Sequence, residues 1–122
     1  EIGLSDYLYS QTAKYYFTNT FLHRSEKVRF KDIYYPIKAS YKNLTTDFDK
    51  LDDVFSEYKN ITIIGSAGSG KTTLIKHIFL KTIFNQNKIP ILIELRNLNE
   101  YNGDFEKLIT EKILKSKVKP SD

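Results

Sequence analysis

The chain has 122 residues and a formal net charge of +4, a length sufficient for one domain with a buried core. It contains no cysteine, which excludes disulfide bonds and thiolate metal sites. No apolar run is long enough to span a bilayer, so we expect neither a secretory segment nor contact with a membrane.

An aromatic helix is predicted near the start of the chain, from about Ser5 to His23. Apolar residues recur there at helical spacing, and they are Leu4, Tyr7, Leu8, Ala13, Phe17 and Phe21, with Tyr15, Tyr16 and Leu22 widening the stripe. Such a stripe needs a packing partner, either the rest of the domain or a neighbouring protein. We interpret it as a core contact.

Two further elements are expected before residue 60. Alternating apolar and aromatic residues from Val28 to Ile37 predict a strand, which Pro36 confines to the edge of a sheet. The capping-box spacing of Thr46 and Asp49 predicts a helix that follows. Its apolar face consists of Phe48, Leu51, Phe55 and Tyr58. The acidic residues of this stretch are scattered around the helix, so they predict a solvated face and no metal site; they are Asp47, Asp49, Asp52 and Asp53.

A glycine-rich sequence follows the apolar run Ile61-Thr62-Ile63-Ile64. It reads Gly65-Ser66-Ala67-Gly68-Ser69-Gly70-Lys71-Thr72, which matches G-x-x-x-x-G-K-T, the Walker A pattern of a P-loop. Small residues let successive backbone N–H groups point at phosphates, and a lysine that opens the next helix can reach the β- and γ-phosphates. The alternative is a glycine-rich turn with a coincidental lysine. The strand pattern before the motif and the helical pattern after it favour the phosphate-binding loop.

The predicted nucleotide-binding residues are Gly65, Ser66, Ala67, Gly68, Ser69, Gly70, Lys71, Thr72 and Thr73. Lys71 is also the candidate catalytic residue. The Thr72 hydroxyl is the candidate Mg²⁺ ligand, and Thr73 is a weaker candidate for the α-phosphate. We therefore expect ATP, or else GTP, bound with Mg²⁺ in a cytoplasmic protein. Tyr34 and Tyr35 could lie near an adenine ring or, as we prefer, be ordinary half-buried strand residues.

The rest of the sequence predicts an α/β arrangement. A helix from about Lys71 to Phe84 leads through a turn at 85–88 to an apolar strand, Ile89–Leu95. Strand, helix and strand in this order make a right-handed parallel crossover. A cap at Asn102-Gly103-Asp104 begins a last helix that ends before Pro120. The expected fold is an incomplete three-layer α/β/α fold with parallel strands, preceded by the first helix and an extended segment.

Hydrolysis by P-loop enzymes needs a second acidic motif, the Walker B strand, which helps to hold Mg²⁺. Only Ile91-Leu92-Ile93-Glu94 offers an apolar run ending in an acid. We therefore predict nucleotide binding more firmly than turnover for this chain.

Two stretches resemble the start of a NACHT-type domain, which belongs to the signal-transducing STAND NTPases. One is Gly65 to Lys76, and the other, more telling, is Ile89-Pro90-Ile91-Leu92-Ile93-Glu94-Leu95-Arg96-Asn97-Leu98. Tyr35-Pro36-Ile37 also resembles a short extended segment of bacterial members. The resemblance runs from about Tyr35 to Leu98, so residues 1–34 are expected to be a separate helical and extended segment, and 35–122 the N-terminal part of the NTPase domain.

The resemblance implies a nucleotide-dependent switch within a larger polypeptide, acting in signalling or antiviral defence, with NTPase activity in the full-length protein. It puts the family's Walker B strand beyond Asp122 and another strand between the two predicted here. The edges left open favour self-association. Arg96 matches the family's strand-end arginine, with either a structural ion pair or a phosphate contact as its role.

Two other functions remain open. The basic C-terminal run, which consists of Lys112, Lys115, Lys117 and Lys119, is either a nucleic-acid patch, as in helicase- or transposition-type ATPases, or a solvated helix face. The second interpretation is favoured, because no aromatic or arginine residues are interleaved with the lysines. The aromatic first helix alternatively suggests a protein-interaction module with residual nucleotide binding.

Overall fold

The structure is a computed structural model that describes residues 2–18, 27–86, 88–99 and 103–114. Its helices are α1 (Ile2–Tyr16), α2 (Phe30–Ile33), α3 (Leu51–Glu57), α4 (Lys71–Asn85), the 3₁₀ turn η1 (Leu95–Leu98) and α5 (Phe105–Leu114). Its strands are β1 (Phe17–Thr18), β2 (Val28–Arg29), β3 (Lys38–Tyr41) and β4 (Leu44–Asp47).

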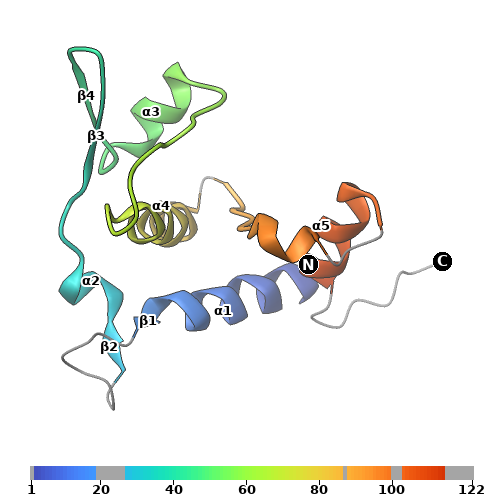
Figure 1. Ribbon diagram of the computed structural model, residues 1–122. Helices are drawn as coiled ribbons and strands as arrows, with labels where there is room; N and C mark the ends of the chain where they lie inside the picture. Colours follow the sequence, from blue (N-terminus) through green and yellow to red (C-terminus); the bar gives the residue numbers. More distant parts are fainter. Residues whose placement is uncertain (1, 19–26, 87, 100–102, 115–122) are drawn as a thin grey trace.

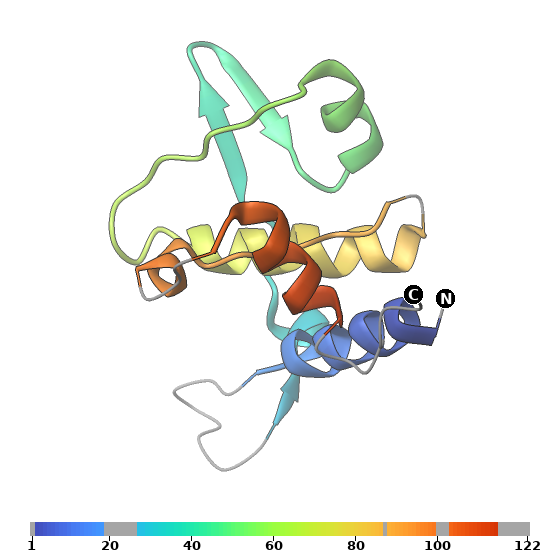
Figure 2. The same ribbon diagram turned by 90° about the vertical axis from the view of Figure 1, so that its right-hand side faces the viewer.

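Helix α4 lies in the middle of the molecule, with α1 below it and the β3–β4 hairpin and α3 above it (Figure 1). Helix α5 passes across α4 in the second view (Figure 2).

Helix α4 begins at the predicted residue and confirms the helix expected after the glycine-rich loop. Its side chains divide between two apolar clusters. Phe79 and Leu80 pack with Tyr15 and Phe30 in the lower cluster, which joins α4 to α1 and α2. Leu74 belongs to the upper cluster with Phe48, Leu51 and Val54. Helix α4 as a whole is therefore fixed by packing on both sides.

The first helix is shorter than predicted. It ends at Tyr16, and Phe17–Thr18 instead pair with Val28–Arg29 in an antiparallel ladder. The buried aromatic residues are Tyr7 and Tyr15, whereas Ala13 and Phe17 of the predicted stripe are exposed. Residues 19–26, which include the predicted Phe21 and Leu22, lie outside the described part of the chain.

The strand predicted over Val28–Ile37 is wrong beyond Arg29. A single helical turn, α2, replaces it and buries Phe30 in the lower cluster, and the chain then continues from Tyr34 to Ile37 without pairing to another strand in the described structure. Burial of the Phe30 ring stabilises this helical turn more than the alternating pattern of residues 28–37 favours a strand.

A hairpin occupies the place where the second helix was expected to begin. Its strands β3 and β4 pair antiparallel, with Lys38 opposite Asp47 and Tyr41 opposite Leu44. Thr46 therefore lies in a strand, and α3 begins only at Leu51. The Asp47 carboxylate accepts a hydrogen bond from the Asp49 amide at 2.9 Å, a local turn that competes with helix formation.

The two segments predicted as parallel strands, 61–64 and 89–95, form no strand ladder within the described residues. The two sheets described there are both two-stranded and antiparallel. Leu95 begins the η1 turn and does not end a strand. The parallel three-layer α/β/α fold thus stays a prediction.

The last helix confirms its expected start. The Asp104 carboxylate accepts a hydrogen bond from the Lys107 amide at 2.7 Å, which caps α5.

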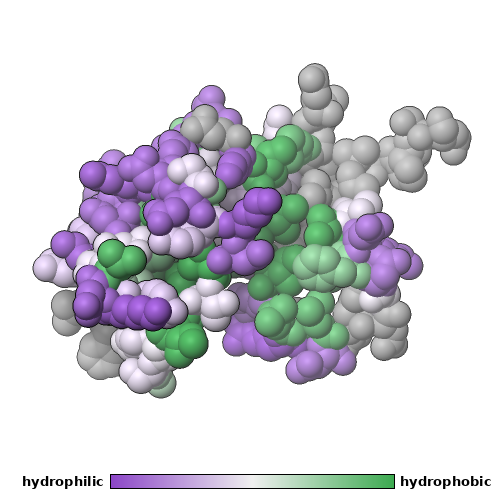
Figure 3. All heavy atoms as spheres, turned by 90° about the horizontal axis from the view of Figure 1, so that it is seen from above, coloured by the Kyte–Doolittle hydropathy of each residue, from purple (hydrophilic) through white to green (hydrophobic). Residues whose placement is uncertain are grey.

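No helix in the described ranges is long and apolar enough to cross a bilayer. From above, apolar side chains reach the surface in the middle of the face, beside a strongly polar part at the left (Figure 3).

Candidate phosphate-binding loop

The loop between Gly65 and Gly70 leaves the unpaired segment 61–64 and turns into the first residue of α4. A hydrogen bond from the Ser69 amide to the Ser66 carbonyl, 3.2 Å long, closes its turn. The first helical bond of α4 follows at once, from the Leu74 amide to the Gly70 carbonyl at 2.8 Å. The motif therefore forms a tight turn on a helix N-terminus, the arrangement from which phosphate loops are built.

Three glycines of the loop are required for different physical reasons. At Gly65 an added Cβ would lie 2.5 Å from the Ser69 Oγ, so the Ser69 side chain would have to move. Gly68 has open space around it but a φ of +77°, which L-residues rarely adopt. Gly70 combines a φ of +86° with a Cβ position only 2.6 Å from the Ile37 Cδ1.

The backbone N–H groups of the loop are available to an anion. Within the described residues, the amides of Gly68, Gly70, Lys71 and Thr72 donate to no protein oxygen. Gly70 is the N-cap of α4 and Lys71 and Thr72 are its first residues, where the helix dipole adds partial positive charge. A phosphate group offers the acceptor oxygens that such donors need.

The Lys71 ammonium folds back over the loop. Its Nζ donates to the carbonyl oxygens of Gly65 at 2.5 Å and Ser66 at 2.6 Å, and it lies 3.3 Å from the Ser69 Oγ. All these acceptors are neutral, and no carboxylate of the described chain pairs with it. The lysine charge is therefore held at the loop without a counterion from the described part of the chain.

A cavity of about 540 Å³ borders the loop on the side of the hairpin. Gly65, Ser69 and Lys71 form part of its wall, and the rest comes largely from β3, β4 and the segment 60–64. A second, smaller cavity of about 280 Å³ lies between α4 and residues 88–92, away from the loop, and its lining is mainly apolar.

The structure places all nine predicted nucleotide-binding residues within this one turn and the start of α4. Residues 65–69 and Thr72 are exposed, whereas Gly70, Lys71 and Thr73 are half-buried. Thr72 follows Lys71 directly in the first turn of α4, and its side chain is exposed. No group of three or more potential metal-binding side chains occurs in the described ranges.

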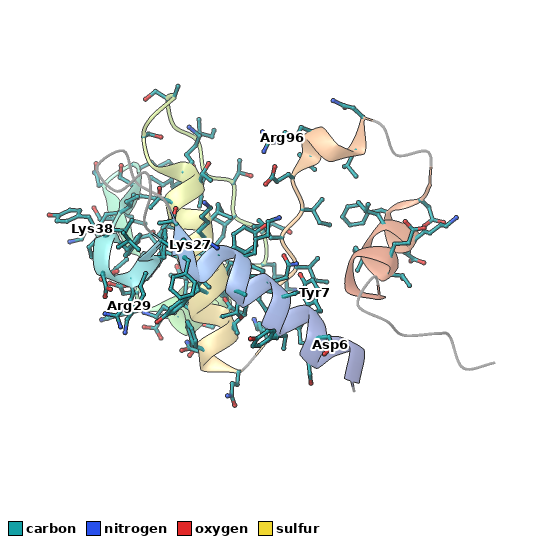
Figure 4. The ribbon with its side chains drawn as sticks, turned by 90° about the horizontal axis from the view of Figure 1, so that it is seen from below. Asp6, Tyr7, Lys27, Arg29, Lys38 and Arg96 are labelled. Atoms are coloured by element: carbon teal, nitrogen blue, oxygen red, sulfur yellow. The ribbon has the colours of Figure 1, made fainter. Side chains whose placement is uncertain are left out.

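The other candidate residues are Arg96 and the two tyrosines considered for an adenine ring. Arg96 donates from its Nε to a Glu94 carboxylate oxygen at 2.7 Å, which makes an ion pair on an otherwise exposed side chain. Figure 4 shows Arg96 at the η1 turn, between helix α5 and the part of the molecule that carries Arg29 and Lys38. Of the two tyrosines considered for an adenine ring, Tyr35 is 83% exposed and Tyr34 stacks on His77.

The four acidic residues predicted to face solvent are exposed, but Asp47 and Asp49 precede α3 and do not lie on it. Asp49 approaches α4, with its Oδ1 2.9 Å from the His77 Nε2 and 3.5 Å from the Lys81 Nζ. Partial desolvation works against its ionisation, but the hydrogen bond with His77 and the positive charge of Lys81 lower the pKa of Asp49 overall. Sequence reasoning missed this contact because it joins distant parts of the chain.

Residue Ile37 was also missed as a neighbour of the loop. Its side chain meets Gly70, and the glycine in the motif was the one available signal that something approaches the backbone closely there.

Comparison of the chain with protein-family models, curated proteins and solved structures found no match.

Proposed function

We propose that this chain binds a nucleoside triphosphate with Mg²⁺, ATP in preference to GTP, through the loop from Gly65 to Thr73. The observation that carries the proposal is the combination of unpaired loop amides with the Lys71 ammonium, which has no carboxylate partner in the described structure. Amides and an ammonium are donors only, so together they suit a group that offers several acceptor oxygens and negative charge.

In this proposal different residues of the loop bind different parts of the triphosphate. The amides at the start of α4 hold phosphate oxygens, and Lys71 exchanges its carbonyl partners for the β- and γ-phosphates. Thr72 supplies a hydroxyl ligand to Mg²⁺, and Thr73 stands near the α-phosphate. The protein is proposed to act in the cytoplasm as the nucleotide-binding part of a NACHT-like switch, whose other segments or a second copy cover the apolar surface that the described chain exposes.

Titration with a fluorescent ATP analogue and Mg²⁺ tests the proposal. Lys71→Ala removes one charge-assisted contact worth about 1.5–3 kcal/mol, so the affinity should fall by roughly tenfold or more. Lys76→Ala is the matched control, because it removes the same charge from the same helix but not from the loop. Equal affinities for the wild type and Lys71→Ala would contradict the proposal.

A further inference from the structure

The phosphate loop is connected to the middle of α4 by a continuous series of side-chain contacts. His77 lies in α4, and its ring stacks on the Tyr34 ring with the centroids 3.9 Å apart and the planes 5° from parallel. Tyr34 also stacks on Phe30 of α2, at 5.5 Å. The tyrosine is thus held between the lower cluster and α4.

The other end of Tyr34 reaches the segment beside the loop. Its phenolic oxygen accepts a hydrogen bond from the Ile37 amide at 3.3 Å. The Ile37 side chain in turn meets Gly70, where even a Cβ would come within 2.6 Å of its Cδ1. Ile37 also packs against the upper cluster, and the hydrogen bond from its amide to Tyr34 adds a polar restraint to this packing.

The orientation of the His77 ring is fixed from its other side. An ionised carboxylate only accepts hydrogen bonds, so the His77 Nε2 donates to the Asp49 Oδ1, 2.9 Å away. The Asp49 backbone N–H donates a hydrogen bond to the Asp47 carboxylate, and the Lys81 ammonium donates to the Asp49 carbonyl. Burial, the largest effect, raises the pKa of Tyr34, and the charges of Asp49 and Asp47 add to this, so its hydroxyl remains neutral at physiological pH.

We propose that His77 is a positioning residue for the phosphate loop. Clamped between Asp49 and Tyr34, it fixes the tyrosine, and the tyrosine holds Ile37 against Gly70. The contact supports the left-handed conformation of Gly70, which sets the direction of the first amides of α4. The inference rests on the proposed function, since the ligand is the triphosphate expected at this loop.

The first test compares His77→Ala with the wild type in titrations with Mg²⁺-ATP and with Mg²⁺-tripolyphosphate. Loss of a positioning contact typically changes coupling by about 0.5–2 kcal/mol, so both affinities should fall by the same factor, roughly 2- to 30-fold. His77→Phe keeps a flat ring against Tyr34 and should bind more tightly than His77→Ala. Lys76→Ala, the neighbouring substitution outside the clamp, should leave both affinities close to those of the wild type.

Three results would overturn the inference. They are wild-type affinity in His77→Ala, a loss that affects ATP but spares tripolyphosphate, and no recovery by His77→Phe. If His77→Ala does not fold, Tyr34→Phe replaces it, since this change removes only the oxygen that accepts from Ile37. It should also weaken both ligands equally, and unchanged affinities would count against the clamp.

A measurement without nucleotide separates this inference from the proposed function. In the ¹⁵N spectrum of the free protein, the Gly70 amide resonance should move in His77→Ala and Tyr34→Phe, whereas that of Gly103 should stay in place. If the wild type binds neither ligand, the proposed function fails while the Gly70 resonance still decides whether His77 controls the loop. A Gly70 resonance that does not move in either variant refutes the clamp.

Discussion

Two glycines of the phosphate loop have positive φ angles, but only one of them has a neighbour in the way. Gly68 faces open space, whereas Gly70 meets the Ile37 side chain. Both positions disfavour an L-residue by about 1–2 kcal/mol, because a Cβ crowds the following carbonyl in this conformation. At Gly70 a Cβ also forces Ile37 away from its rotamer, which costs about 0.5–1.5 kcal/mol more.

We therefore expect Gly70→Ala to lower the melting temperature more than Gly68→Ala does. Thermal unfolding followed by circular dichroism measures both variants against the wild type. Equal melting temperatures for the two variants would show that Ile37 does not pack on Gly70 as described.

Asp49 makes stability depend on pH in a defined direction. Desolvation is the largest single effect and opposes ionisation, but His77 and Lys81 together lower the folded-state pKa of Asp49 below its ordinary value of 3.8. A lowered folded-state pKa means that the carboxylate contributes stability above pH 3.8 and that this contribution is lost as the pH falls through the folded-state pKa.

Urea unfolding of the wild type and Asp49→Asn tests this direction. The difference in their free energies of unfolding should shrink as the pH falls below about 4. Asp52→Asn is the control, since the Asp52 side chain has no partner in the described structure, and it should show no such pH dependence. A difference for Asp49→Asn that persists unchanged at pH 2.5 would contradict the pairing.

At the scale of elements, α1 is anchored to the segment after α4 by a buried tyrosine. Tyr7 is 1% exposed, and its hydroxyl donates to the Pro90 carbonyl at 3.2 Å. Figure 4 shows Tyr7 on the face of α1 that is turned toward the rest of the molecule. Burial raises the pKa of this phenol, so the hydroxyl keeps its proton for the bond at neutral pH.

Tyr7→Phe should lower the free energy of unfolding by about 0.5–1.5 kcal/mol, because it removes the hydrogen bond and leaves a carbonyl oxygen with one partner fewer. Tyr9→Phe is the matched control on the same helix, since Tyr9 is 80% exposed. Chemical denaturation measures both. If the two variants are equally stable, α1 is not docked through Tyr7.

The elements that the sequence predicted well are those determined locally. The helix after Lys71 and the capped helix after Asp104 follow from motif, cap and apolar spacing within a few residues. The β3–β4 hairpin was missed because its strands lack clear alternation and its turn contains Lys42, at a φ of +54°, in place of a glycine. The clamp at His77 was not predictable from local pattern, since it joins residues far apart in the chain.

At the scale of the whole molecule, the position of the loop at the start of α4 could be predicted, because it follows from one contiguous motif. The parallel sheet expected beside the loop could not be checked in the same way. A parallel sheet depends on strands brought together over long sequence separations, and the segments 61–64 and 89–94 have no ladder in the described part. They leave apolar side chains at the surface, among them Ile64 at 90% exposure and Ile89 at 51%.

The central claim is that the amides of the loop hold a triphosphate. The chain has five glycines, of which Gly65, Gly68 and Gly70 belong to the loop and Gly103 lies just before α5. Titration of ¹⁵N-labelled protein with Mg²⁺-ATP should move the Gly68 and Gly70 amide resonances downfield, as new hydrogen bonds form, while Gly103 stays in place. Saturating nucleotide that leaves the Gly68 and Gly70 resonances where they are in the free protein would contradict the account.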